Sequence, residues 1–183
     1  MRRPAAAALL LLLGACGPTS QDGPSVDPEL LAAATASYDA DALDAALARI
    51  EAWAEAHNPA AAAALRPGLS EREIDRLTAD LPCRLTTEAR RLYQWHDGSQ
   101  SGAPPLFWYH RFMGLEEAVA TYRERVAAGT DPAFAWDPAW FPVFQSPGEH
   151  YVVGCPGDRR VAAPVWFKAV ERRTPASFAA SLT

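Results

Sequence analysis

The sequence is poor in the residues and motifs from which most catalytic and metal sites are built. Its 183 residues include 3 cysteines and 4 histidines. The HExxH, P-loop, GxSxG and paired CxxC motifs, each of which would indicate a particular chemistry, do not occur in it. We therefore predict no catalytic residue, no cofactor and no metal site, and we expect a protein that is not an enzyme.

Basic residues are outnumbered as well. The chain has 17 Lys and Arg against 22 Asp and Glu, and its net charge is −5. Loss of residues 1–15 would remove two arginines and no acid, which leaves 15 basic residues and a charge of −7. Such a chain repels polyphosphate at long range, and it has no basic stripe, so we expect no nucleic-acid partner.

The N-terminus, "MRRPAAAALLLLLGAC", has two arginines followed by an apolar run from Ala5 to Leu13. This run is too short for a permanent membrane helix and is typical of a secretory signal. Leu13 to Cys16 is similar to a bacterial lipobox, which predicts a signal peptide over 1–15 and a diacylglyceryl group on Cys16. The alternative is an ordinary cleaved signal in which Cys16 is incidental.

The residues next to the cysteine refine the expected location and domain limits. Gly17 stands where an aspartate would retain a lipoprotein in the inner membrane. This favours the cell envelope, with a lipid anchor in the outer membrane and the domain facing the periplasm. Residues 16–28 are rich in Pro, Gly, Ser and Asp and predict a flexible tether, which leaves one domain over 29–183.

Four segments have apolar residues at helical spacing. They are residues 43–57, 70–81, 87–96 and 115–128. Asp39 or Asp41 can cap the first, and Asn58-Pro59 ends it. Ser70 and Glu73 have the spacing of a capping box, in which side chain and backbone groups satisfy each other at a helix start.

The second half of the sequence favours strands. They are predicted at 106–112, 141–144, 150–155 and 163–170, and a short closing helix is predicted from Thr174-Pro175. Helices followed by strands, with one helix between the strands, predict an α+β fold. We expect a mostly antiparallel sheet of about four to six strands that is flanked by helices.

The stretch "LYQWHDG" at 92–98 has two interpretations. His96 and Asp97 could form a catalytic dyad, but no serine or cysteine nucleophile in a recognisable motif lies nearby. We favour a structural role, in which His96 lies in the last helical turn and Gly98 adopts the left-handed conformation that follows a helix.

The order of these motifs resembles the SUKH superfamily, which includes the Smi/Knr cell-wall assembly regulators. The stretches that carry the resemblance are "LRPGLSEREIDRL" at 65–77, "LTTEARRLYQWHDG" at 85–98, "LEEAV" at 115–119, "WFPVF" at 140–144 and "SFAASL" at 177–182. The family implies a non-enzymatic protein-binding module, such as an immunity protein that neutralises a toxin or a cell-wall assembly accessory. The chain departs from the family pattern at Thr86, where a proline is usual, and at Gly148-Glu149, where a Gly-Asp turn is usual.

Aromatic residues indicate where a protein partner could bind. Strand alternation cannot place all of residues 107–109 on one face, and two more tryptophans lie in a loop. We therefore expect a binding face of Trp108, Trp136, Trp140 and Glu149, for a partner that is a toxin or an envelope protein.

A small envelope enzyme or a ligand-binding lipoprotein is the alternative function. It would use the region of His96, His110 and Glu149, and convergence of these residues on one cleft would favour it. His110 and His150, with Glu149 nearby, would give two imidazoles and a carboxylate, a set that suits zinc, but surface or edge-strand histidines explain the pattern as well.

Cys83 and Cys155 are the two cysteines that remain once Cys16 carries lipid. An exported chain enters an oxidising compartment, and both residues lie at the ends of predicted elements. A disulfide between them is one possibility, and two separately buried thiols are the other.

Lipid anchoring predicts that Cys16→Ser will move the protein from the membrane fraction to the soluble fraction, because the acceptor sulfur is lost. Cell fractionation and the mass of the mature N-terminus measure this. Unchanged membrane retention of the variant, or a mature chain that begins at another residue, would contradict the prediction.

Overall fold

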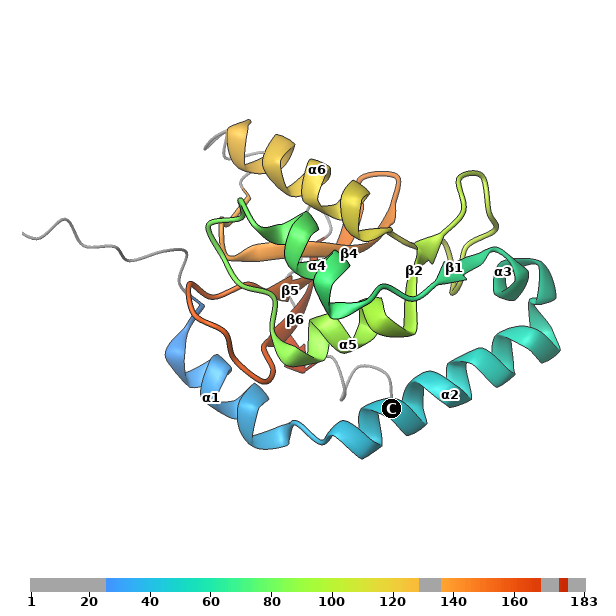
Figure 1. Ribbon diagram of the computed structural model, residues 1–183, viewed down its shortest axis with the longest axis horizontal. Coiled ribbons are helices and arrows are strands. Elements are labelled where there is room, and N and C mark those ends of the chain that lie inside the picture. The colour runs from blue at the N-terminus through green and yellow to red at the C-terminus, as the bar shows by residue number, and fades with distance from the viewer. Residues whose placement is uncertain (1–25, 129–135, 169–174, 178–183) are drawn as a thin grey trace, which may run out of the picture.

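The computed structural model describes residues 26–128, 136–168 and 175–177, and within these ranges the chain forms six helices and two antiparallel sheets (Figure 1). The helices are α1 (Pro28–Ser37), α2 (Ala40–His57), α3 (Pro59–Ala63), α4 (Glu71–Thr78), α5 (Thr87–Trp95) and α6 (Leu115–Ala127). The strands are β1 (Leu65–Pro67), β2 (His96–Ser99), β3 (Arg111–Phe112), β4 (Trp140–Ser146), β5 (Glu149–Gly154), β6 (Pro164–Lys168) and β7 (Pro175–Ser177). The predicted α+β class is confirmed.

The larger sheet has five strands in the order β3-β4-β5-β6-β7, within the predicted range of four to six. Every neighbouring pair is antiparallel, and β1 and β2 form a separate two-stranded ribbon. The predicted closing helix is wrong at its start, because residues 175–177 pair with β6 as a strand. The rest of that segment, 178–182, lies outside the described residues.

Local capping signals place the helices correctly. Asp39 caps α2 and accepts hydrogen bonds from the backbone N–H groups of residues 41 and 42. Ser70 and Glu73 form the predicted capping box at the start of α4, and the Thr86 side chain caps α5. Each cap satisfies N–H groups that a helix start leaves without partners, so the chain enters the helix at these residues.

The predicted strand over 106–112 is wrong for most of its length. The chain turns at Trp108 and Tyr109, a bridge closes the turn between Phe107 and His110, and only residues 111–112 form a strand. The turn explains how the consecutive aromatic residues 107–109 are accommodated, since a strand could not place all three on one face. It buries Leu106 and His110 on the inside while Trp108 and Tyr109 remain 83% and 78% exposed.

The end of α5 also differs from the prediction. The helix stops at Trp95, and His96 is extended because it begins β2, where its Nδ1 lies 2.7 Å from the carbonyl oxygen of Arg66. Gly98 has the predicted left-handed conformation, with φ +70°, but within β2. A Cβ there would lie 2.3 Å from the backbone nitrogen of Gly114, so the close approach of two chain segments also requires glycine.

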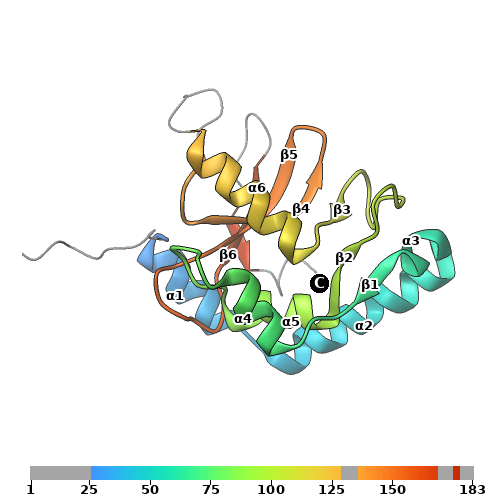
Figure 2. The same ribbon diagram turned by 45° about the horizontal axis from the view of Figure 1, so that its top comes forward.

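Two clusters of buried side chains stabilise the domain. The larger one lies between the sheet and the helices α2, α4, α5 and α6, whose ribbons are seen in Figure 2. The smaller one includes Trp136, Trp140 and Trp166, and Val26 packs with them. Val26 is buried and α1 begins at Pro28, so the predicted tether over 16–28 is too long at its end.

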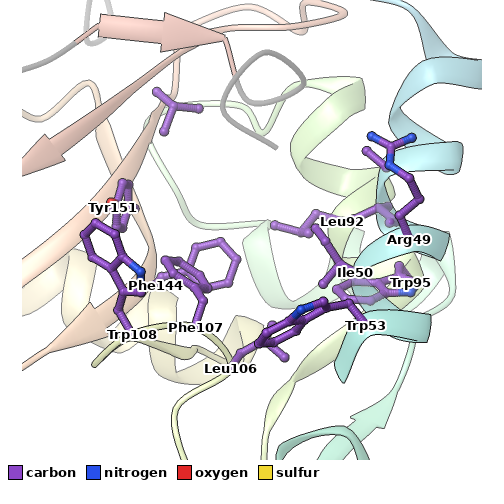
Figure 3. A pocket seen from close by; sticks show the side chains of 13 residues that line it. Arg49, Ile50, Trp53, Leu92, Trp95, Leu106, Phe107, Trp108, Phe144 and Tyr151 are labelled. Carbon is purple, nitrogen blue, oxygen red and sulfur yellow. The ribbon is translucent and has the colours of Figure 1, made fainter. Parts of the chain in front are cut away.

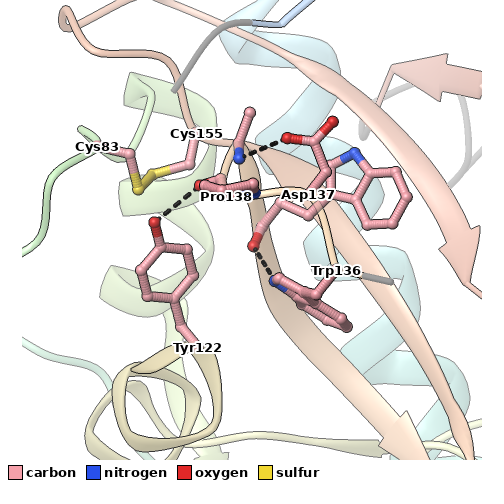
Figure 4. Close-up of a disulfide and its surroundings, with 8 residues drawn as sticks. Cys83, Tyr122, Trp136, Asp137, Pro138 and Cys155 are labelled. Atoms are coloured by element: carbon pink, nitrogen blue, oxygen red, sulfur yellow. Dashed lines mark hydrogen bonds between the residues drawn. A yellow bond between two sulfur atoms is a disulfide. The ribbon is translucent and has the colours of Figure 1, made fainter. Parts of the chain in front are cut away.

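A disulfide joins Cys83, just beyond α4, to Cys155 at the end of β5 (Figure 4). Both cysteines are fully buried, and their Cα atoms are 5.2 Å apart. Next to the bond, the backbone N–H of Arg84 donates to the Pro156 carbonyl at 2.7 Å. Of the two possibilities that the sequence left open, the structure has the bonded one.

No described helix has both the length and the apolar character that crossing a membrane requires.

Replacement of both cysteines, Cys83→Ala with Cys155→Ala, should lower the free energy of unfolding by up to about 4 kcal/mol, since the bond closes a loop of 72 residues. Urea unfolding measures the change. With a reducing agent present, the wild type should approach the stability of the double variant. Peptide mapping of unreduced protein that finds the two cysteines in separate peptides would contradict the bond.

Candidate functional site

An apolar cavity of about 390 Å³ lies between the helices α2 and α5 and the large sheet (Figure 3). Its walls come from α2, α5, the turn at 106–108 and the strands β4, β5 and β6. The lining residues are Ala46, Leu47, Arg49, Ile50, Trp53, Leu92, Trp95, Leu106, Phe107, Trp108, Phe144, Tyr151 and Val165. This size and composition are typical of pockets for small molecules or for the apolar side chains of a partner.

Aromatic rings form opposite walls of the cavity. Figure 3 shows Phe107, Trp108 and Tyr151 on the sheet side, and Trp53 and Trp95 on the helix side. Phe107 packs edge-to-face against Phe144 and Tyr151, with ring centroids 5.1 and 5.7 Å away. The wall is therefore held by ring contacts that do not need a ligand.

Two exposed tryptophans, Trp53 and Trp108, stand on opposite sides of the cavity (Figure 3). We call this pair the aromatic mouth. Trp53 is 50% exposed and Trp108 is 83% exposed. Large apolar side chains left in water contribute little to folding, but they contribute strongly when a partner covers them.

The backbone of Trp108 supports a role outside folding. Its φ is 47°, and it is the one non-glycine residue with positive φ in the described chain. The left-handed conformation costs a residue with a Cβ about 1–2 kcal/mol, and the exposed ring regains little of this through packing. A glycine or asparagine would fit the turn at lower cost, which suggests that the indole is retained for an interaction.

Arg49 is the one charged residue among those that line the cavity. It is exposed, and it makes no ion pair with any residue in the described part of the chain. Nearby, the indole N–H of Trp95 donates to Glu51 at 3.1 Å and is already satisfied. As far as the described residues show, the cavity therefore combines apolar walls with one positive charge, that of Arg49.

The structure does not bring the predicted binding face together. Trp108 is exposed, but Trp136 and Trp140 are 8% and 3% exposed and lie in the smaller core cluster. The indole N–H of Trp136 donates to the Trp140 carbonyl oxygen at 3.0 Å (Figure 4). Glu149 lies at the start of β5, with its carboxylate 3.7 Å from His110. A face that includes Trp136 and Trp140 is wrong, because both are needed to fill the core.

Of the predicted alternative site, the structure brings His110 and Glu149 together but places His96 elsewhere. His96 lies 3.5 Å from Glu51, and Asp97 pairs with Arg66 at 2.9 Å and accepts the N–H of Leu115 at 2.7 Å. His110 lies elsewhere, between the rings of residues 107, 151 and 167. These side chains are therefore engaged in two separate structural networks.

His110 and His150 do not form a joint metal site with Glu149. Glu149 and His150 are neighbours in β5, so their side chains point to opposite faces of the sheet. His110 contacts the face of Glu149, whereas His150 packs against Trp136. Across the described ranges, no group of three His, Cys, Asp or Glu side chains is arranged to hold a metal ion.

Sequence reasoning missed most of the cavity. Trp53 was visible as a tryptophan beside the apolar stripe of its helix, a position that periodicity assigns to the surface. Its partner across the cavity, Trp108, comes from a turn 55 positions later, and Arg49 belongs to the site only because α2 packs beside that turn. No local pattern reports this packing.

His150 predicts a specific pH dependence of stability. Burial, then the positive charges of Arg125 and His110, lower its pKa from 6.5 to about 4 in the folded protein. Between these pH values the unfolded chain binds the extra proton. The contribution of the buried, neutral His150 to stability is therefore complete above about pH 6.5 and is lost as the pH falls towards 4. The loss amounts to up to about 3 kcal/mol.

His150→Gln should flatten the dependence of the unfolding free energy on pH between 4 and 6.5, because glutamine does not titrate. Urea titrations at several pH values measure this slope. His57→Gln is the matched control, since His57 is exposed. An unchanged slope in His150→Gln would show that another group is responsible.

The comparisons with known proteins do not assign a family. A scan against models of protein families finds no match, and a search of curated proteins finds no similar sequence. The resemblance to the SUKH superfamily therefore stays a prediction from the order of motifs, and the function must be argued from the geometry of the site.

Proposed function

We propose that the protein is a non-enzymatic binding domain of the SUKH type that is anchored by lipid on Cys16 at the bacterial cell envelope. Its anchor lies in the outer membrane, and the domain faces the periplasm. It engages another protein there, as an immunity protein that neutralises a toxin or as an accessory of cell-wall assembly. The binding site for this partner is the aromatic mouth at the entrance of the apolar cavity.

The observation that carries this proposal is the aromatic mouth itself. Tryptophan is enriched among the residues that dominate protein interfaces, especially where its ring enters or covers an apolar pocket. Here two exposed tryptophans stand beside a cavity, and one of them is held in an unfavourable backbone conformation. A partner side chain inserted between the rings would be surrounded by apolar surface.

The polar residues favour binding over catalysis. A general acid or base must reach the substrate, so it has to line a space that a substrate can enter. None of the cavity-lining residues identified above is a histidine, an aspartate or a glutamate. His96 and His110 each contact local structural partners instead, and we therefore propose no second, catalytic function.

Site-specific photo-crosslinking in the cells that produce the protein tests the proposal. With p-benzoylphenylalanine in place of Trp108, illumination should join the domain to a discrete envelope or toxin protein, because the probe lies at the mouth of the site. Mass spectrometry identifies the product. The same probe in place of Val161, a residue that is 40% exposed elsewhere, is the matched control.

The partner should also be captured less by a full-length chain that carries Trp108→Ser. Equal crosslinking from positions 108 and 161, or products that contain only the protein itself, would contradict a protein partner at the mouth.

A further inference from the structure

We propose that the cavity binds a single-chain anionic amphiphile, a molecule of the fatty-acid class, with its acyl chain among the aromatic walls and its carboxylate at Arg49. This inference goes beyond the proposed function and does not depend on it. The protein partner would contact the exposed mouth, whereas the amphiphile would fill the interior.

The apolar walls favour a ligand whose buried part has no polar groups. Leu47, Leu92 and Val165 contribute only aliphatic surface, and the N–H of Trp95 is already bonded to Glu51. An extended peptide inside the cavity would exchange water for apolar walls at each backbone N–H and carbonyl, which is unfavourable without new hydrogen bonds. An acyl chain has no such groups, so its entry only removes apolar surface from water.

The positive charge of Arg49 favours a ligand with an anionic head group. Arg49 lines the cavity and has no ion-pair partner among the described residues, so its guanidinium can bind an anion without first breaking an ion pair within that part of the chain. The chain as a whole is acidic, and Arg49 is the one charged residue among those identified as lining this cavity. The lining residues that the structure describes include no carboxylate that would repel the head.

The position of Arg49 agrees with this arrangement. It is exposed, while Ile50, the next residue of α2, is partly buried in the core. Figure 3 shows the guanidinium at the edge of the cavity and Ile50 deeper along the same wall. A bound carboxylate could therefore remain in contact with water while its chain extends inwards, which avoids the cost of burying a charge.

Calorimetric titration with sodium octanoate, decanoate and dodecanoate tests the acyl-chain part. The protein is the full-length chain with Cys16→Ser, purified without detergent, and each probe is kept below its micelle concentration. The affinity should increase about fourfold for each methylene that is buried. Affinity that does not change with chain length, or the absence of binding by all three probes, would overturn the proposal.

Two variants link binding to the cavity. Ile50→Trp should fill the interior and abolish dodecanoate binding, provided that its melting temperature is unchanged. Trp108→Ser, which alters an exposed side chain and is expected to leave folding intact, should weaken binding, whereas Val161→Ser should not. Equal affinity of the variants at 108 and 161 would place the bound chain outside the cavity and overturn the proposal.

The head group is tested separately. Dodecanoate should bind about two- to fivefold more tightly than the uncharged dodecyl maltoside, which is the range expected for an exposed ion pair. Arg49→Gln should remove this preference. Arg72→Gln, the matched control at another exposed arginine that forms no ion pair within the described chain, should retain it. Tighter binding of dodecyltrimethylammonium than of dodecanoate would refute the assignment of an anion.

Competition with vesicles distinguishes a free amphiphile from a membrane lipid as the source of the acyl chain. A free single-chain amphiphile should bind in the presence of phosphatidylglycerol vesicles, after correction for its partition into the bilayer. Vesicles that bind the protein directly and displace dodecanoate would indicate a membrane surface as the ligand and would overturn the assignment. These results are independent of the photo-crosslinking result, so either proposal can fail without the other.

Discussion

The covalent and hydrogen-bonded seam between residues 83–88 and 155–161 holds the helical half of the domain against the sheet. The disulfide Cys83–Cys155 lies at one end of it, and the backbone N–H groups of Thr87 and Glu88 donate to the carbonyls of Arg160 and Val161 at 2.8 Å each. Because these donors lie in the first turn of α5, the seam also satisfies N–H groups that the helix cannot bond internally. It thereby fixes α5, and α5 forms one wall of the cavity.

A second long-range contact positions the turn at 106–110, which forms another wall of the cavity. The side-chain amide of Asn58, the residue between α2 and α3, donates to the Pro105 carbonyl at 3.0 Å. Pro105 directly precedes the turn that displays Trp108, so the end of α2 and the turn are tied to each other. The two sides of the aromatic mouth are consequently linked by the fold, and the cavity does not depend on a ligand to position its walls.

Sequence reasoning succeeded where the determining interactions are local. The capping box of Ser70 and Glu73 and the cap at Asp39 involve neighbours within three residues, and the structure contains both. It failed where burial depends on distant segments. Trp136 packs in a cluster with Val26, which is 110 positions earlier, and Gly98 faces the backbone of Gly114. The cavity belongs to this second kind, because it exists only where α2 lies opposite the turn at 106–110.

The two histidines with lowered pKa values lie away from the apolar cavity. Burial lowers the pKa of His110 and of His150, and a neutral imidazole at ordinary pH is what a general base requires. Neither histidine lines the apolar cavity, and each is only 3–5% exposed, although His150 lines a separate cavity of about 460 Å³ together with Arg111 and Arg125. The apolar cavity, in turn, is lined by apolar residues and one arginine, which can attract an anion but cannot exchange a proton near neutral pH. The proposed binding of an anionic apolar ligand therefore rests on the apolar walls and on Arg49, and not on the histidines.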